Sequence, residues 1–421
     1  MINHKKTFFK NMMTLLMGST LAQVIPFILL PILQKWFYSP TQFGELALYT
    51  SLTMLLAQVA GFKYEFAIVQ ANTEREAENV FSGTLLIIIM FTLVVAVAFN
   101  FFPLFAGRLF GVSEIAPYFY LIPFSVLFFS GFETFNYWNN RQKRYKQIAA
   151  AKITKTLAAE TAKLDLAYYH NAVKGLVIGR VLGEFAAFIL LIQRFIVNDW
   201  KHFHFSSLHE IMKSLKIHYR FPLFTMPSVF VGNLINLVFL SLFTTYFGAA
   251  KAGVIGISVI YISVAFGLIA QSFSQVFYKE LNETKGKKEL LKLYLGNAKY
   301  LIIISFIAVV AIQLIPSQWV AYLLGDQWVD LMPTLKVLIF SYAVSFVSSS
   351  LSFIYMRVNK QKQMLVFDIM HLVMVSASIY FAYQYYGTFM ATLISYTIAQ
   401  VAYYSFAFLI AIVFIKNMKD S

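Results

Sequence analysis

Residues 62–83 read FKYEFAIVQANTEREAENVFSG and place a dense run of charge between two apolar stretches. Thr73, followed three residues later by Glu76, has the pattern of a capping box, in which the two side chains satisfy free N–H groups at the start of a helix. A helix is therefore predicted to begin near Thr73 and to continue through the apolar run LLIIIMFTLVVAVAF. Because the residues before Phe62 are just as apolar, the polar segment is predicted to join two buried helices.

The composition indicates what buries these helices. Of the 421 residues, 59% are hydrophobic and only 13% are charged, with a mean hydropathy of +0.67, whereas about a quarter of the residues in a soluble domain are charged. An integral membrane protein is therefore predicted. A helix that crosses the bilayer needs about 20 mainly apolar residues, and the chain contains twelve such runs. The predicted spans are residues 11–33, 43–61, 80–103, 116–136, 147–169, 174–196, 221–246, 252–277, 299–320, 333–356, 364–385 and 388–415.

The first span follows a basic start, MINHKKTFFK, so a cleaved signal peptide is the alternative interpretation. Its apolar stretch is longer than the apolar region of about 7 to 15 residues that is usual in signal peptides. An uncleaved first span is therefore expected. The chain contains no cysteine, which excludes disulfides and thiolate metal sites, and no motif in the sequence indicates a cofactor.

The distribution of basic residues predicts the orientation of the spans. With the N-terminus in the cytoplasm, 25 of the 34 Lys and Arg residues fall on cytoplasmic segments, and only Lys35, Arg108, Lys174 and Lys251 fall outside. This asymmetry is the positive-inside pattern. It predicts a multi-pass protein of the cytoplasmic (inner) membrane with both termini in the cytoplasm. Anionic lipid at that face is a sufficient partner for the net charge of +15, and no nucleic acid is needed to explain it.

Three pairs of segments recur in the same order along the chain. NRQK from Asn140 aligns with NKQK from Asn359, at an offset of 219 residues. Upstream of each, LFGVSEIAP resembles LLGDQWVDLMP, and FYSPTQFGELAL resembles YFGAAKAGVIGI. The common order and the nearly constant offset predict an internal duplication.

The duplication predicts the architecture. Each half would have an even number of spans, so both halves would have the same orientation, which is the parallel-repeat design of some secondary transporters. The predicted fold is an all-α integral membrane protein with twelve transmembrane helices. These form two six-helix lobes, residues 1–205 and 206–421, around a central cleft.

The segment after the second predicted span resembles the corresponding link of Wzx-type polysaccharide flippases of the multidrug/oligosaccharidyl-lipid/polysaccharide (MOP) superfamily. That link reads aromatic, Glu, any residue, Ala-Ile, and then acidic residues and Asn. The matching positions are Tyr64, Glu65, Ala67, Ile68, Glu76 and Asn79. Three further stretches also match the family: YWNNRQKRYKQI, FPLFTMPSVFVGNLIN and AQSFSQVFYKE. Together with the number of spans, the resemblance covers nearly the whole chain.

The resemblance implies a flippase that moves an undecaprenyl-diphosphate-linked oligosaccharide from the cytoplasmic to the outer leaflet. The product would be a surface polysaccharide such as O-antigen, capsule or exopolysaccharide, and the polymerase and glycosyltransferases of the same pathway would be partners. The parallel repeat suggests alternating access of the cleft as the mechanism. The family pattern contains no catalytic residues, so none is assigned.

Two other classes of function remain open. A small-molecule or drug cation antiporter of the same superfamily would depend on a carboxylate within the membrane that titrates with the substrate, whereas a carrier of diphosphates would depend on cations. A membrane-embedded polymerase or glycosyltransferase is the enzyme alternative, but the outer loops are short for a catalytic site. The histidines of DWKHFHFSSLHEIMKSLKIHYR have no spacing that enforces a metal site, and an amphipathic interfacial segment is favoured there.

Basic residues inside the predicted spans are the candidate substrate contacts. In the fifth span Lys152, Lys155 and Lys163 fall on one helical face, and Arg180 lies in the sixth span. A charge in hydrocarbon costs at least about 2.5 kcal/mol, so these groups should face water, a partner or the bundle interior. Lys155, Lys163 and Arg180 are therefore predicted to bind the diphosphate in an electropositive cleft, with Lys152 a further candidate. The alternative is that Lys152 and Lys155 reach the cytoplasmic headgroups while Lys163 pairs with Glu160.

Acidic residues and one histidine inside the spans are candidates for coupling transport to an ion. Glu160 lies three residues from Lys163, and Glu184 lies four residues from Arg180, so each can form a pair along its helix. Asp368 and His371, one turn apart in the eleventh span, could exchange protons. Simple solvation at the cytoplasmic end of that span is the alternative for Asp368.

Overall fold

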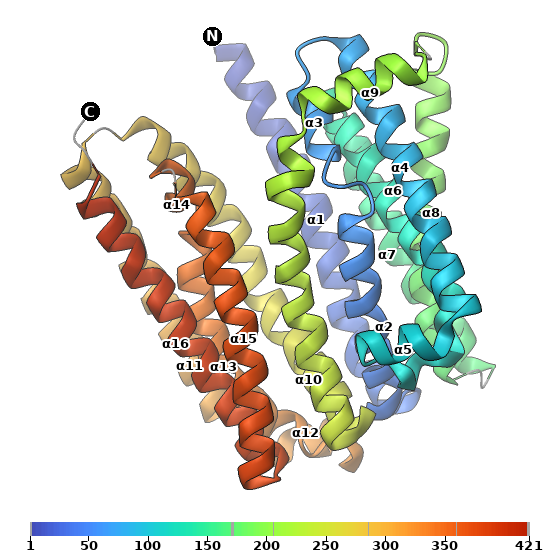
Figure 1. The fold of residues 1–421 in the computed structure, drawn as a ribbon. Coiled ribbons are helices and arrows are strands. Elements are labelled where there is room, and N and C mark those ends of the chain that lie inside the picture. Colours follow the sequence, from blue (N-terminus) through green and yellow to red (C-terminus); the bar gives the residue numbers. More distant parts are fainter. Residues whose placement is uncertain (1, 170–171, 205, 285, 359, 419–421) are drawn as a thin grey trace. The chain divides into compact units, whose positions relative to one another are not determined.

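The computed structural model describes residues 2–169, 172–204, 206–284, 286–358 and 360–418. In these ranges the chain is almost entirely helical and contains no strand (Figure 1). The chain divides into two compact units, unit 1 (Met1–Leu237) and unit 2 (Val238–Ser421). The predicted all-α class is confirmed. The predicted lobes, 1–205 and 206–421, stay a prediction, because compactness alone does not identify the bodies that move in a transporter.

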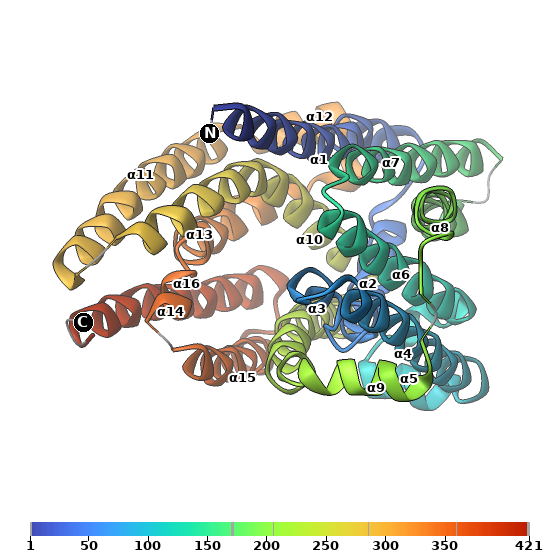
Figure 2. The same ribbon diagram turned by 90° about the horizontal axis from the view of Figure 1, so that it is seen from above.

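Unit 1 contains every element up to the first part of α10. Its long helices are α1 (Ile2–Trp36), α2 (Pro40–Val59), α4 (Glu74–Phe101), α6 (Ile122–Arg141), α7 (Tyr145–Tyr168) and α8 (Ala172–Asn198). Short segments join them: α3 (Glu65–Gln70), α5 (Pro103–Phe110), the 3₁₀ helix η1 (Ser113–Leu121), α9 (Leu208–Ile217) and the π-helical turn η2 (Phe221–Thr225). Viewed along the helices in Figure 2, α7 lies between α1 and α8, and it packs closely on both.

Unit 2 is built from the second part of α10 (Met226–Glu283) and the helices that follow it. Gly248 divides α10, because its φ of 82° and ψ of 164° lie outside the helical region and favour glycine. The remaining elements are α11 (Lys287–Leu314), α12 (Ser317–Leu324), the 3₁₀ turn η3 (Asp326–Trp328), α13 (Leu331–Ser350), α14 (Ile354–Arg357), α15 (Gln361–Tyr386) and α16 (Phe389–Lys416). Within the unit, α16 packs on both α13 and α15.

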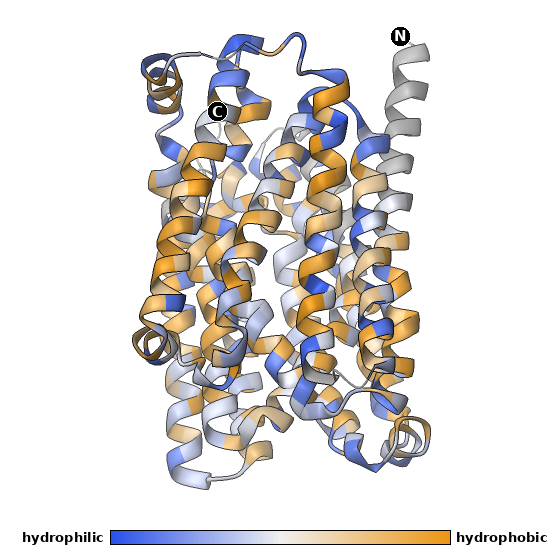
Figure 3. Cartoon of the chain, turned by 90° about the vertical axis from the view of Figure 1, so that its right-hand side faces the viewer, coloured by the Kyte–Doolittle hydropathy of each residue, from blue (hydrophilic) through white to orange (hydrophobic). Residues whose placement is uncertain are grey.

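Each predicted span overlaps a long helix or one part of α10. In the described part of the chain, 8 helical segments are long and apolar enough to cross a membrane, and one of them, Phe221–Gly267, includes the seventh predicted span and most of the eighth. Figure 3 shows apolar residues along most of the length of these helices. The largest difference from the prediction is at the ninth span. There α11 begins at Lys287 rather than at residue 299, because Leu290 and Tyr294 extend its buried face.

The link between α2 and α4 is a compact structure rather than an open loop. Phe62 and Lys63 have positive φ values of 49° and 62°, which turn the chain sharply after α2. The turn carries the Lys63 ammonium back into the unit, where it donates to Gln58 Oε1 at 2.6 Å and to Glu65 Oε1 at 3.1 Å. Both charged side chains are buried. Lys63 and Glu65 therefore form a buried ion pair, whereas Glu74 and Arg75 of the same link are exposed.

Arg141, at the end of α6, holds the second half of the link. Its guanidinium donates to the carbonyl oxygens of Ile68 and Ala71 at 2.9 and 2.8 Å and lies 3.2 Å from the carboxylate of Glu74. The predicted cap is present, because Glu76 N donates to Thr73 Oγ1 at 3.1 Å and Thr73 is the N-cap of α4. The carboxylate of Glu76 accepts from Asn72 N rather than from the cap residue itself.

Aromatic side chains fill the interior beneath this link. Phe81 of α4 packs against Phe135 and Trp138 of α6, with 5.1 Å between ring centroids in each pair. Phe195 of α8 and Phe203 close the cluster. Edge-to-face and offset contacts of this kind contribute about 0.5 to 1.5 kcal/mol per pair beyond burial. The cluster therefore holds α4, α6 and α8 together at the end of unit 1 where the link lies.

The histidine-containing segment forms an amphipathic helix, α9, on the surface of α4. Ser207 and Glu210 form its capping box, and the backbone N–H of Ser207 lowers the pKa of the Glu210 carboxyl. Arg75 pairs with Glu210 at 2.7 Å, and Asn79 donates to Ser214 at 3.0 Å. The opposite face exposes apolar and basic side chains, namely Leu208, Met212, Lys213, Lys216 and Ile217. The predicted amphipathic character is confirmed, and its contact with lipid stays a prediction.

Candidate functional site

Helix α8 approaches α7 unusually closely because three glycines, each four residues from the next, face α7. A Cβ atom on Gly183 would lie 2.5 Å from the carbonyl oxygen of Lys155 and 2.7 Å from the Cβ of Ala159. Gly175 and Gly179 are similarly crowded. Such a stripe lets the backbones of membrane helices come together. The signal was present in GLVIGRVLG, residues 175–183, but the sequence analysis did not use it.

Lys155 lies at the centre of the candidate site. Its ammonium lies over two aromatic rings of α6, 4.7 Å from the centroid of Phe129 and 5.5 Å from that of Phe132. The cation and the ring faces attract each other, which stabilises a charge in this largely apolar setting. No carboxylate of the described residues lies within ion-pair distance of Lys155. The nearest charges that act on it belong to Glu184 and Arg180 of α8, to Glu133 of α6 and to Lys152.

Arg180 and Glu184 form the predicted pair along α8. Nη2 of Arg180 lies 3.1 Å from Oε1 of Glu184, and the Glu184 side chain is 1% exposed. The pair is poorly satisfied, because Nε of Arg180 and both carboxylate oxygens of Glu184 make no hydrogen bond within the described part of the chain. Buried charged groups are costly when their hydrogen-bonding capacity is unused. Arg180 therefore keeps a donor that an anion could use.

Lys163 forms an ion pair with a residue of its own helix and packs against Gly179 of α8. It pairs with Glu160, with 2.6 Å between Nζ and Oε1, and its backbone carbonyl accepts a hydrogen bond of 2.7 Å from Tyr38, which lies between α1 and α2. Eight residues separate Lys163 from Lys155, which is about 12 Å along a helix. The charge of Arg180 thus acts on Lys155, whereas Lys163 already has a carboxylate partner in Glu160.

Glu133 of α6 belongs to the Lys155 cluster, and the sequence analysis missed it. The charges of Lys155, Glu65, Lys63 and Lys152 all act on its partly buried side chain. Glu133 is the one acidic residue of the predicted span 116–136. A carboxylate inside a span is by default a candidate functional residue, and that rule would have found it.

Asp368 and His371 share a polar cluster in unit 2. Tyr403 of α16 connects them, because its hydroxyl donates to Asp368 at 3.3 Å and its ring stacks on the His371 imidazole at 3.8 Å between centroids. His371 is buried, and its Nε2 lies 2.7 Å from Oε1 of Gln400. The Gln400 amide group donates in turn to Tyr396 at 2.7 Å. Both coupling candidates of α15 are thus anchored by α16.

Two other histidines, His204 and His218, each lie beside one carboxylate. His218 lies 2.8 Å from Glu76, and His204 lies 3.4 Å from Glu78. Across the described ranges, no group of three or more His, Asp or Glu side chains is placed to hold a metal ion. Both contacts instead connect the region around α9 to the start of α4.

The fold is similar to solved structures of MOP-superfamily transporters. The inward-facing conformation of a multidrug resistance MATE family transporter matches with a TM-score of 0.71 and 17% identity, over 97% of this chain and 96% of that one. The lipid II flippase MurJ, in an inward closed conformation, matches with a TM-score of 0.68 and 13% identity, over 98% and 90%. A MOP-superfamily transporter from Pyrococcus furiosus matches with a TM-score of 0.64 and 15% identity, over 98% and 97%. These matches confirm the predicted fold, that of a multi-pass helical membrane protein.

One protein family matches the sequence itself. Its description is "Polysaccharide biosynthesis protein", and it matches residues 36–333. No curated protein sequence matches the chain. The matched range includes the whole of α7 and α8, and therefore the cluster around Lys155 and Arg180.

Proposed function

Because the chain belongs to the family of polysaccharide biosynthesis proteins and has the fold of MOP-superfamily transporters, we propose that it is a lipid flippase. Its substrate is an undecaprenyl-diphosphate-linked oligosaccharide, which it moves from the cytoplasmic to the outer leaflet for a surface polysaccharide. The polymerase and glycosyltransferases of that pathway are its proposed partners. The transporters and the flippase that share this fold support transport rather than catalysis.

The cluster of Lys155 and Arg180 is the observation that carries the proposal. A diphosphate brings about two negative charges to a depth where water is scarce, and cations fixed inside a helical unit lower that cost. The Lys155 ammonium has no carboxylate within ion-pair distance among the described residues, and Arg180 keeps an unused donor. Both can therefore bind phosphate oxygens without first breaking a good ion pair. Lys152 is a secondary candidate, and Lys163 is held by Glu160.

Alternating access is the proposed mechanism. The two halves of the predicted repeat would rearrange so that a cleft opens to each side of the membrane in turn, while the polyprenyl chain stays in the bilayer. Glu184 and Glu133 lie beside the cations, so proton or cation binding at either carboxylate would change the charge that the diphosphate meets. Asp368 and His371 remain coupling candidates in unit 2.

A cation antiporter is the second candidate function. The observation that favours it is Glu184, a buried carboxylate whose oxygens make no hydrogen bond within the described ranges, in a fold that a multidrug transporter shares. Such a site would bind an organic cation through Glu184 and would gain nothing from Lys155.

A reconstitution experiment tests the two functions against each other. Vesicles that contain the purified chain and undecaprenyl-diphosphate-N-acetylglucosamine are treated from outside with a galactosyltransferase that cannot enter. We expect the enzyme to label more lipid than the outer leaflet held at the start, because the protein brings lipid from the inner leaflet. In vesicles without protein, labelling should stop when the outer-leaflet lipid has been used. Uptake or release of a cationic dye, without any movement of the lipid, would replace the flippase proposal with the antiporter.

The proposed orientation places both termini and the segment between α6 and α7 in the cytoplasm. The sequence has no cysteine, so single cysteines at Lys143 and Lys287 give unambiguous labels, with cysteine at Lys251 as the outside control. In intact cells, an impermeant thiol reagent is expected to label position 251 and to leave 143 and 287 unlabelled until the membrane is opened. Labelling of 143 or 287 in intact cells would reverse the orientation.

A further inference from the structure

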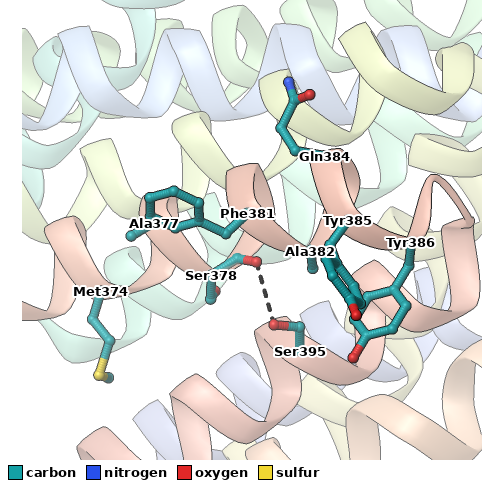
Figure 4. Close-up of a pocket in the computed structure, with 9 residues that line it drawn as sticks. All are labelled: Met374, Ala377, Ser378, Phe381, Ala382, Gln384, Tyr385, Tyr386 and Ser395. Atoms are coloured by element: carbon teal, nitrogen blue, oxygen red, sulfur yellow. Dashed lines mark hydrogen bonds between the residues drawn. The ribbon is translucent and has the colours of Figure 1, made fainter.

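A groove in unit 2 runs along α15 beside α16 and has a volume of about 710 Å³ (Figure 4). This size lies within the range of about 300 to 1,000 Å³ that is usual for small-molecule sites. Nine residues line it: Met374, Ala377, Ser378, Phe381, Ala382, Gln384, Tyr385, Tyr386 and Ser395. All nine residues belong to unit 2.

The chemical character of the groove changes along its length. Met374 and Ala377 form one end, which offers only apolar surface. Twelve residues separate Met374 from Tyr386, which is about 18 Å along a helix, and at this far end the lining becomes aromatic and hydroxylated. In the predicted orientation of the chain, the tyrosine end is the outer end of α15.

The two tyrosines form a rigid aromatic wall. Their rings meet edge to face, with centroids 4.8 Å apart and an interplanar angle of 83°, and in Figure 4 they lie against one another. Tyr385 is 83% exposed and Tyr386 is 60% exposed. Within the described part of the chain, neither hydroxyl makes a hydrogen bond, and the amide of the neighbouring Gln384 makes none. The groove therefore offers free ring faces and free phenol groups, whereas the Gln384 side chain points away from the two rings (Figure 4).

We propose that this end of the groove binds the saccharide of the lipid-linked substrate. A sugar ring has apolar C–H faces, which pack on aromatic rings, and hydroxyl edges, which hydrogen-bond to phenol and amide groups. The rings and hydroxyls of Tyr385 and Tyr386 offer both kinds of contact. The inference rests on the proposed function and adds to it a site for the sugar on α15.

The chain provides a matched control for the general enrichment of tyrosine at membrane interfaces. Tyr168 and Tyr169 end α7 in unit 1 and also meet edge to face, with centroids 5.5 Å apart. They are 74% and 72% exposed and do not line the groove. If tyrosine served only to anchor helix ends in the membrane interface, the two pairs would be equivalent.

Binding of two probes that differ by one sugar tests the inference. The full-length protein in lipid nanodiscs is titrated with undecaprenyl diphosphate and with undecaprenyl-diphosphate-N-acetylglucosamine. We expect the unsubstituted chain to prefer the second probe about tenfold, which corresponds to about 1.4 kcal/mol. Tyr385→Ala with Tyr386→Ala should remove the preference, and Tyr385→Phe with Tyr386→Phe should keep part of it, because the rings remain. Tyr168→Ala with Tyr169→Ala should keep all of it.

Each other outcome has a definite meaning, provided that every variant elutes as a folded, monodisperse protein. An unchanged preference in the Tyr385→Ala, Tyr386→Ala variant overturns the inference. So does an equal loss in the Tyr168→Ala, Tyr169→Ala variant, which would indicate a general interfacial role. Tight binding of both probes without preference, as expected for a groove that accepts any lipid, overturns the inference alone. If neither probe binds, the proposed function fails and the inference fails with it.

Discussion

Replacing Lys155 by glutamine is expected to reduce transport of the lipid-linked substrate about tenfold or more, while the amount of protein in the membrane stays unchanged. The ammonium would donate to the diphosphate, and a hydrogen bond to a charged group contributes about 1.5 to 3 kcal/mol, so its loss lowers binding by about one to two orders of magnitude. Folding should tolerate the change. The ammonium contacts the faces of Phe129 and Phe132, and no described carboxylate within ion-pair distance is left unpaired.

The measurement is surface polysaccharide in cells that lack the endogenous copy of the chain, normalised to protein in the membrane. Glu160→Gln with Lys163→Gln is the matched control, because it removes a charged pair from the same helix without touching the Lys155 cluster. Lys155→Arg should restore part of the transport, since it restores the charge. Normal polymer from Lys155→Gln at normal protein level would remove Lys155 from the site, and an equal loss in the control would indicate a general need for charge on α7.

Replacing Gly183 by leucine is expected to abolish the folded protein. Even alanine would place its Cβ 2.5 Å from the carbonyl oxygen of Lys155, and that oxygen belongs to the backbone, so α7 must move. Overpacking of this kind typically costs about 1 to 3 kcal/mol, and the larger side chain of leucine should cost more. Gly183→Ala should therefore survive with a lower melting temperature in detergent, and Gly183→Leu should be degraded or aggregate.

Gly296 of α11 is the control for this prediction, because a Cβ there would meet no atom within 4 Å. Gly296→Ala is expected to be neutral or stabilising by up to about 1 kcal/mol, since glycine weakens a helix interior. Equal melting temperatures for Gly183→Ala and the unsubstituted chain would show that α7 and α8 can separate without cost. The close approach would then not hold Lys155 in place.

Local signals in the sequence predicted much of the fold. The cap at Thr73 and the pairs Arg180–Glu184 and Glu160–Lys163 depend on residues three or four positions apart, so spacing alone was sufficient. The spans followed from the length of apolar runs, and their helices are present. Where the helix boundary depended on packing, as at the start of α11, the prediction was wrong by several residues.

The spacing of residues along the sequence could not predict contacts between distant segments. The helical wheel placed Lys155 and Lys163 on one face, but it could not show that Lys155 would lie over rings of α6 while Lys163 paired with Glu160. Glu133 became visible as a neighbour of Lys155 only when α6 and α7 were brought together. Likewise Tyr403, which connects Asp368 to His371, lies on a different helix. Their roles in binding and coupling stay predictions.

The hydrogen bonds from Arg141 to the link after α2 also affect the order in which the chain reaches its final structure during synthesis. Arg141 and the carbonyl of Ile68 are 73 residues apart, and ribosomes add about 5 to 20 residues per second. At this rate, about 4 to 15 seconds pass between the addition of Ile68 and the addition of Arg141. Until then, the carbonyls of Ile68 and Ala71 cannot accept hydrogen bonds from this guanidinium. The N-terminal hairpin thus reaches its final shape only after the helix that ends at Arg141 has been inserted.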